Sequence, residues 1–174
     1  SNITVNVSGA DIVGKDFYGM KIGDVAAAWA NPANAPNIAP LVWVLQDQTL
    51  VEGSEIELTF AASNFNNLSA YQFALDFDPT QMQFVEFQPL SALQLNLLNN
   101  FGAYNADLGE LRHVWSAGVG TTLADGTPVF RAKFKVLKGG QKLSDVLRID
   151  DSQIECKAFS GISAPADVKV AFAE

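Results

Sequence analysis

The side chains best suited to acid–base chemistry in this sequence are a single histidine, His113, and a few closely spaced carboxylates. His113 precedes Ser116 by three residues, and a histidine that takes the proton of a serine hydroxyl is central to many hydrolases. The sequence nevertheless contains neither the G-x-S-x-G pattern of a serine nucleophile nor the H-E-x-x-H pattern of zinc peptidases. We therefore expect His113 to be a structural or interface residue, and we predict no catalytic residue.

Two pairs of aspartates, Asp76 with Asp78 and Asp150 with Asp151, have the spacing that could support glycosidic chemistry. Asp78, however, directly precedes Pro79, where an aspartate caps a turn. The fold class argued below also offers no cleft around such a pair. Calcium held by these loop aspartates is an alternative, but we favour a protein with no metal, no cofactor and no enzymatic activity.

Flat aromatic rings that stack on sugars are a different kind of functional group. Tyr104 and Trp115 are the candidates for sugar stacking, because their exposure is open from the sequence alone. Trp43 lies in a wholly apolar stretch and Tyr71 shares the phase of Phe73, so both are expected in the core. An exposed aromatic strip would favour a carbohydrate-binding module.

The composition excludes several classes of partner. The formal net charge is −8, with only 11 lysines and arginines, so neither nucleic acid nor anionic lipid is an expected partner. No apolar run approaches the roughly 20 residues of a membrane-spanning helix, so we expect no membrane insertion. The one cysteine, Cys156, is expected to be a small buried side chain.

These groups must be positioned by strands, and the clearest strand pair is YQFALDFDPTQMQFVEF, residues 71–87. Tyr71, Phe73, Leu75 and Phe77 alternate with polar or small residues, which is typical of a strand with one buried face. The turn residues Asp78-Pro79-Thr80-Gln81 follow. In the returning run, from residue 82 to 87, the alternation slips, which indicates a bulge near residues 84–85 or burial of both faces.

The remaining apolar runs are short and separated by turn residues. About nine strands are expected between Leu41 and Glu174, with one helical turn in a long crossing loop at 90–101 and a loop at 118–120. This spacing predicts an all-β fold, an antiparallel nine-stranded jelly-roll β-sandwich. The apolar runs that could supply these strands number ten, at 41–45, 55–61, 71–77, 82–87, 103–106, 110–117, 128–137, 146–149, 153–158 and 167–172.

The first 40 residues differ in texture from the rest. Residues 1–30 predict a short N-terminal extension with a marginal helix at 16–28, which Gly19 and Gly23 weaken. Residues 31–40, NPANAPNIAP, predict an extended linker. The main domain is therefore expected at 41–174.

The order of motifs in that domain resembles the cohesin module of surface proteins from Bacteroidetes-type bacteria. The motifs are VEGSEIELTF, AYQFALDFDPTQMQFVEF, GELRHVW, LADGTPVFRAKFKV and ADVKVAF. The resemblance implies a nine-stranded sandwich related to carbohydrate-binding modules, located outside the cell, that binds dockerin segments and so attaches proteins to scaffolds. It places the partner on a sheet face built from the strands that resemble residues 71–76, 103–106 and 111–116. The outward side chains there, and hence the expected partner-binding residues, are Gln72, Ala74, Asp76, Arg112, Val114 and Ser116.

The leader FYGMKIGDV, residues 17–25, resembles the end of a degenerate dockerin-like segment. A working dockerin needs a D-x-[DN]-x-[DN]-G calcium loop, and Asp11, Asp16 and Asp24 do not have that spacing. The leader is thus not expected to bind calcium, and the cohesin resemblance of the main domain implies a non-catalytic extracellular module for protein–protein interaction. The alternative is a carbohydrate-binding module, with a polysaccharide as the ligand, on the same type of sandwich.

Overall fold

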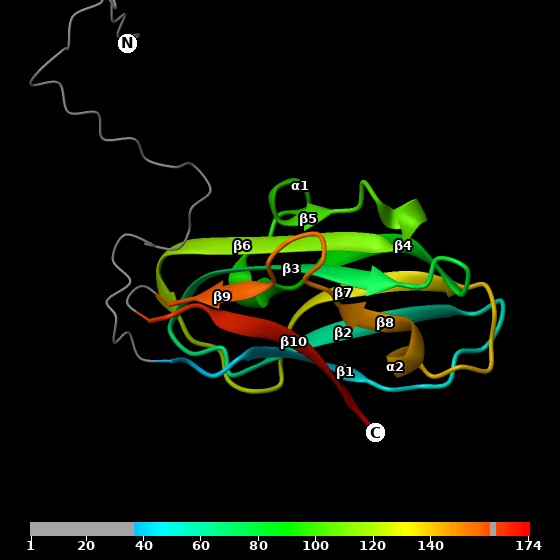
Figure 1. Ribbon diagram of the computed structural model, residues 1–174, viewed down its shortest axis with the longest axis horizontal. Helices are drawn as coiled ribbons and strands as arrows, with labels where there is room; N and C mark the ends of the chain where they lie inside the picture. The colour runs from blue at the N-terminus through cyan, green and yellow to red at the C-terminus, as the bar shows by residue number, and fades with distance from the viewer. Residues whose placement is uncertain (1–36, 161–162) are drawn as a thin grey trace, which may run out of the picture.

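The computed structural model describes residues 37–160 and 163–174, and the expected extension at 1–30 lies outside these residues. The described chain consists almost entirely of strands joined by short connections (Figure 1). The ten strands are β1 (Leu41–Gln46), β2 (Glu55–Ser63), β3 (Leu68–Phe77), β4 (Met82–Pro89), β5 (Phe101–Gly102), β6 (Glu110–Thr121), β7 (Thr127–Val136), β8 (Leu147–Ile149), β9 (Lys157–Phe159) and β10 (Ala166–Ala173).

The helical pieces are single turns. The α-helical turns are α1 (Leu97–Asn100) and α2 (Leu143–Val146), and the 3-10 turns are η2 (Ser91–Leu93) and η3 (Ala106–Leu108). The turns η2 and α1 lie in the crossing connection between β4 and β5, where the sequence predicted one helical turn. None of the helices described has the length and apolar character needed to span a bilayer.

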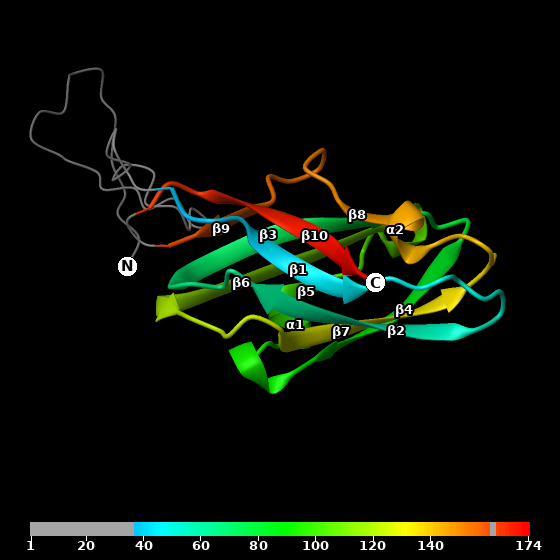
Figure 2. The same cartoon turned by 90° about the horizontal axis from the view of Figure 1, so that it is seen from below.

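The strands follow one another around the core in the order β4-β7-β2-β1-β10-β9-β3-β6-β5, and β8 pairs with β3 beside β9. Figure 2 shows β3 and β8 on one side of the molecule and β2 and β7 on the other. The all-β sandwich prediction is confirmed. Nearly all pairs are antiparallel, but β1 and β10 pair in parallel, from Leu41 with Val168 to Gln46 with Ala173. The two ends of the domain thus lie side by side, which a wholly antiparallel prediction did not contain.

The β3–β4 hairpin has the predicted form. The carboxylate of Asp78 accepts hydrogen bonds from the N–H of Thr80 at 2.8 Å and from its hydroxyl at 2.7 Å, which fixes the turn. In β4 the pairing with β7 shifts register between Phe84 and Glu86. This bulge confirms one of the two explanations for the slipped alternation, because an extra residue reverses the phase of the side chains that follow it.

The core is aromatic at its centre. Trp43 makes edge-to-face contacts with Tyr71 and Phe130 at ring-centroid distances of 5.3 and 5.5 Å, and Phe60 stacks on Phe130 at 4.3 Å. All four predicted inward residues of β3, from Tyr71 to Phe77, are buried. Burial of these large side chains is the main favourable contribution to folding, at about 25 cal/mol per Å² of apolar surface.

Three strand predictions were wrong in position. Of the strand expected at 153–158, only the last two residues belong to β9 (Lys157–Phe159), because residues 150–156 form the connection from β8. The strand expected at 103–106 is β5 at Phe101–Gly102, because Phe101 stacks on His113 across the pair at 4.4 Å. The loop expected at 118–120 belongs to β6, which continues to Thr121. Its pairing with β3 becomes irregular there, between Leu68 and Ala70 of β3, so the glycines lie in an irregular part of the strand.

Candidate interaction face

Strands β3 and β6 present a shared row of outward side chains. The antiparallel register places Gln72 opposite Val114, Ala74 opposite Arg112 and Asp76 opposite Glu110. Opposite residues of an antiparallel pair point to the same side of the sheet. The register therefore brings all six predicted partner-binding residues to one side of the sheet, with Ser116 opposite Ala70 at its end. We call this surface the β3–β6 face.

The β6 half of this face is open to solvent. Arg112, Val114 and Ser116 are all exposed, and they alternate with the buried side chains of Leu111, His113 and Trp115. The phase of this strand could not be decided from sequence, because its outward positions hold one charged, one apolar and one small polar residue. The burial of His113 and Trp115, which alternate with these positions, fixes the phase of the strand.

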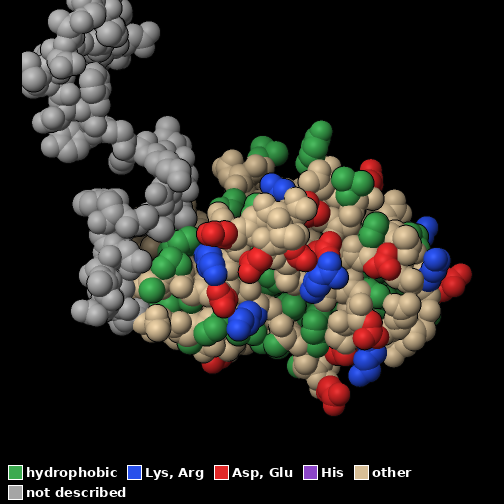
Figure 3. Space-filling model, in the orientation of Figure 1, with side chains coloured by type: hydrophobic (Ala, Val, Ile, Leu, Met, Phe, Trp, Pro, Cys, Tyr) green, Lys and Arg blue, Asp and Glu red, His purple; other side chains and the backbone are tan. Residues whose placement is uncertain are grey.

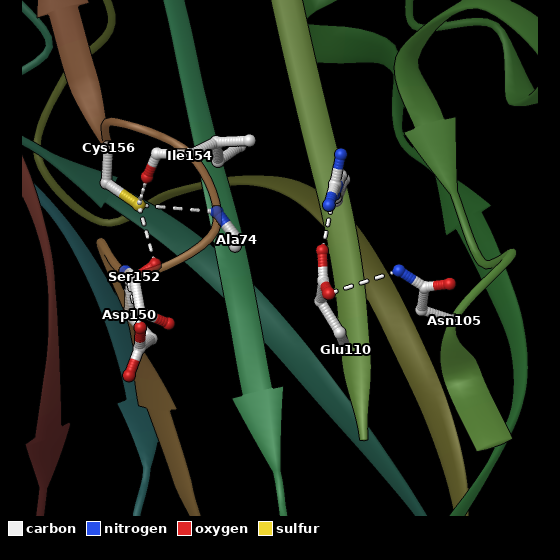
Figure 4. A network of polar contacts seen from close by, with 8 residues as sticks. Ala74, Asn105, Glu110, Asp150, Ser152, Ile154 and Cys156 are labelled. Carbon is white, nitrogen blue, oxygen red and sulfur yellow. Dashed lines mark hydrogen bonds and ion pairs between the residues drawn. The ribbon is translucent and has the colours of Figure 1, made fainter. Parts of the chain in front are cut away.

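The β3 half is partly covered by the connection between β8 and β9, residues 150–156. The N–H of Ala74 donates to Sγ of Cys156 at 3.3 Å (Figure 4). The carbonyl of Ala74 accepts from the N–H of Asp150 at 3.2 Å. Nε2 of Gln72 donates to the carbonyl of Glu155 at 2.9 Å. Ala74 is 1% exposed, so its predicted place among surface residues was wrong. Ala74 is buried because the 150–156 connection covers it, and no local sequence pattern around residue 74 predicts that contact.

Charged groups at the same end of the face are paired with one another. Asp76 forms an ion pair with Arg148, which lies 3.3 Å from Asp150, and Glu110 forms one with Arg112. Figure 4 shows Glu110 beside Asn105, whose Nδ2 donates to it at 3.1 Å. Partial burial raises the pKa of Asp76, the nearby Asp150 and Glu110 raise it further, and Arg148 opposes them.

The two candidate sugar-stacking residues differ sharply. Tyr104 is 99% exposed, at the connection between β5 and η3. Trp115 is buried: Tyr71 stacks on it at 5.6 Å and Phe65 meets it edge-on at 5.5 Å. The structure therefore contradicts a stacking role for Trp115, because its ring is packed in the protein. The sequence left the exposure of Trp115 undecided only because it left the phase of its strand undecided.

His113 lies inside the core rather than in a cleft. Its Nδ1 is 2.7 Å from the carbonyl of Asn100, and its Nε2 is 2.8 Å from the hydroxyl of Tyr71. Burial lowers the pKa of His113 to about 3, against a smaller opposing effect of the Asn100 carbonyl. Ser116 points to the opposite side of the sheet, so the two do not meet. His113 is the structural strand residue that the sequence favoured.

The aspartates weighed for catalysis serve turns. Asp150 accepts from the N–H of Ser152 at 2.6 Å, and Asp151 accepts from the N–H of Cys156 at 2.8 Å. Cys156 is buried as predicted, and burial raises its thiol pKa to about 11. Among residues 37–160 and 163–174, no cluster of three or more His, Cys, Asp and Glu side chains is arranged to hold a metal ion.

Sequence reasoning missed several residues that shape this surface. Arg148 neutralises Asp76, Glu110 neutralises Arg112, and Leu98 of α1 is 93% exposed. The adjacent leucines 97 and 98, both exposed, carried no signal of their exposure, since neighbouring residues of a helical turn can share its buried stripe. The charged partners carried none, because they come together only through strand pairing.

The candidate site is thus the partly covered outer face of two paired strands in a β-sandwich. The family model of the cohesin domain matches residues 41–161, and the chain belongs to this family, whose domains are non-catalytic binding modules. A search of the curated proteins gave no match.

Solved structures share the fold. The sixth cohesin of scaffoldin B from Acetivibrio cellulolyticus, in complex with a mutant Cel5 dockerin, has a TM-score of 0.57 and 16% identity, over 77% of this chain and 98% of that one. The third cohesin of ScaC in complex with the ScaB dockerin, from the same organism, has a TM-score of 0.55 and 18% identity, over 77% and 99%. A Coh-OlpA–Doc918 complex from Clostridium thermocellum has a TM-score of 0.54 and 12% identity, over 77% and 99%.

Proposed function

We propose that this cohesin domain is an extracellular module that binds a dockerin-type protein through the β3–β6 face and so attaches that protein to a scaffold. The observation that carries the proposal is the exposed strip of Arg112, Val114 and Ser116 on β6. A flat surface that mixes apolar, charged and small polar side chains is typical of a protein interface of moderate size. The similar structures solved with dockerins support the same class of partner.

Within the proposed face, the roles are unequal. Val114 is free to contact a partner directly, and Arg112 is exposed although it pairs with Glu110. Gln72 and Asp76 are held by Glu155 and Arg148 and border the contact. Ala74 is buried and does not reach the surface. An arginine is well suited to such a surface, because its guanidinium offers several donors in a fixed plane.

The test is a binding measurement against purified dockerin modules encoded in the genome that encodes this chain, with the full chain immobilised. We expect at least one to bind, and Val114→Asp to weaken that binding at least tenfold with an unchanged thermal midpoint. Val51→Asp, at another exposed valine in the connection between β1 and β2, is the matched control and should bind like the wild type.

If no dockerin binds and the chain is instead retarded in a polysaccharide gel, the protein-binding proposal is wrong. Tyr104 would then be the first residue to substitute, because Trp115 is buried. Binding of a dockerin that is indifferent to Val114→Asp would place the interface on another face of the module.

A further inference from the structure

Two nearly fully exposed apolar side chains flank β5, next to the open strip of β6. Leu98 lies on α1, before β5, and Tyr104 follows β5. Figure 3 shows hydrophobic side chains projecting along the upper edge of the molecule, where Figure 1 places α1 and β5. Apolar side chains gathered beside a polar surface commonly mark an interaction site, whereas a single one needs no explanation.

The backbone that carries Leu98 is held by asparagines. Oδ1 of Asn96 accepts from the N–H of Leu98 at 2.9 Å, and the N–H of Asn96 donates to Oδ1 of Asn100 at 2.7 Å. Nδ2 of Asn100 donates to the carbonyl of Val114 at 2.8 Å. We call residues 96–102 the α1–β5 arm. Its asparagines, which do not favour a longer helix, tie it directly to the open strip.

The arm is also fixed from inside the core. Nδ1 of His113 lies 2.7 Å from the carbonyl of Asn100, and the ring of Phe101 stacks on His113 at 4.4 Å with an interplanar angle of 19°. Phe101 in turn packs on Phe87 at 4.6 Å. Leu98 is therefore displayed on a base that is already ordered, so a partner that covers it loses little backbone entropy.

Tyr104 stands at the other flank, beside a polar cluster. Gly102, Tyr104, Asn105, Glu110 and Arg112 line a hollow of about 100 Å³. The carboxylate of Glu110 holds both Asn105 and Arg112 there. Tyrosine and arginine are the residue types that most often carry the binding energy of protein interfaces, especially next to ordered neighbours.

We propose that Leu98 and Tyr104 are anchor residues of the partner interface, and that the partner is a protein segment with apolar side chains facing both residues across Val114. This inference rests on the proposed function and names the part of the face that carries it. The open strip at Val114 is continuous with the arm through the Asn100 hydrogen bond. Asn100 is the positioning residue, because it ties the backbone of the arm that carries Leu98 to β6.

Charge and chemistry favour this occupant over two others. A second copy of the chain would bring two bodies of net charge −8 together, which opposes self-association. A sugar would gain from the ring of Tyr104, but the aliphatic side chain of Leu98 has no polar group for its hydroxyls. A row of apolar side chains on a protein partner can pack against both Leu98 and Tyr104.

The test uses the full chain and the dockerin module that binds the wild type in the panel described above. Leu98→Asp and Tyr104→Ala should each raise the Kd at least tenfold, because each removes an apolar side chain that the partner covers. Both side chains are exposed, so the thermal midpoints should not change. Val51→Asp, which is exposed elsewhere, should leave the Kd within twofold.

A double-mutant cycle tests the role of Asn100. In the Asn100→Ala background, Leu98→Ala should cost clearly less affinity than it does in the wild type, because the arm is no longer held in place. Equal losses in both backgrounds would overturn the positioning role. Wild-type binding that is insensitive to both Leu98 and Tyr104 would overturn the anchor proposal and leave the proposed function intact, whereas a failure of every dockerin to bind would remove both.

Discussion

The hydroxyl of Tyr71 lies 2.8 Å from Nε2 of His113 at the centre of the domain, between two strands that pair side by side. Each is a polar group in an aromatic core, and each is buried. Because the Nδ1 of His113 faces a backbone carbonyl, that nitrogen is the donor, and Nε2 accepts from the tyrosine. The hydrogen bonds satisfy both nitrogens of the neutral imidazole, and they explain how a histidine is accommodated in this core.

The first prediction concerns the pH dependence of stability. The folded-state pKa of His113 is about 3, below its ordinary value of 6.5. Between these values the unfolded chain binds a proton that the folded chain does not, so stability falls as the pH is lowered from 6.5 towards 3. The slope from His113 approaches about 1.4 kcal/mol per pH unit well inside this window.

Urea unfolding at pH 5.0, 6.0 and 7.0 measures this slope, in a range where most carboxylates stay ionised. His113→Gln should be less stable at pH 7 but should show a flatter dependence over the same range. A variant with the same slope as the wild type would assign the titration to another group.

The second prediction is that Tyr71→Phe destabilises the fold through His113. The ring keeps its packing, but Nε2 of His113 loses its donor inside the core, which costs about 1–3 kcal/mol. Tyr104→Phe removes the same atom from an exposed ring and should change stability by less than about 0.5 kcal/mol. Chemical denaturation measures the free energy of unfolding of both variants. Equal, small losses in the two would mean that the buried hydrogen bond does not contribute to stability.

The third prediction compares two glycines with positive φ. Gly109 has φ +86°, and a Cβ there would overlap the carbonyl oxygen of Phe77 and lie 2.9 Å from Cδ of Pro79. Gly53 has φ +79° with nothing within 4 Å of such a Cβ. Gly53→Ala should therefore cost only backbone strain, about 1 kcal/mol, whereas Gly109→Ala should cost about 3 kcal/mol or more, since overlap is added to strain.

Thermal unfolding of the two alanine variants separates overlap from strain. Similar midpoints would show that the chain around the β3–β4 turn moves freely enough to admit the methyl group.

The fourth prediction is that the thiol of Cys156 is unreactive in the folded protein. Burial raises its pKa to about 11, and Sγ contacts the backbone of Ala74 and Asp150. At pH 8 an aromatic disulfide reagent should label the wild type only as the β8–β9 connection opens or the chain unfolds. Ser116→Cys should add one thiol that reacts at once. Immediate labelling of the native cysteine would show that this connection opens readily and exposes the β3 half of the face.

Local patterns determined much of this architecture. The alternation at Tyr71 to Phe77, the Asp78-Pro79 turn and the phase slip after Met82 each depend on neighbouring residues, and each has its predicted counterpart in the structure. The motif order also indicated the cohesin family, which the family model confirms. Such features can be predicted from the sequence because side-chain phase and turn formation depend on only a few neighbouring residues.

Contacts between distant segments decided the rest. The β8–β9 connection buries Ala74 from 76 residues or more along the chain, Tyr71 and Phe65 bury Trp115, and the parallel pairing of β1 with β10 joins the two ends of the domain. The sequence could therefore propose which strands form the face but not which of its side chains remain in water. Exposure is a property of the assembled surface, because it depends on what packs against a residue and not on the residue's own alternation.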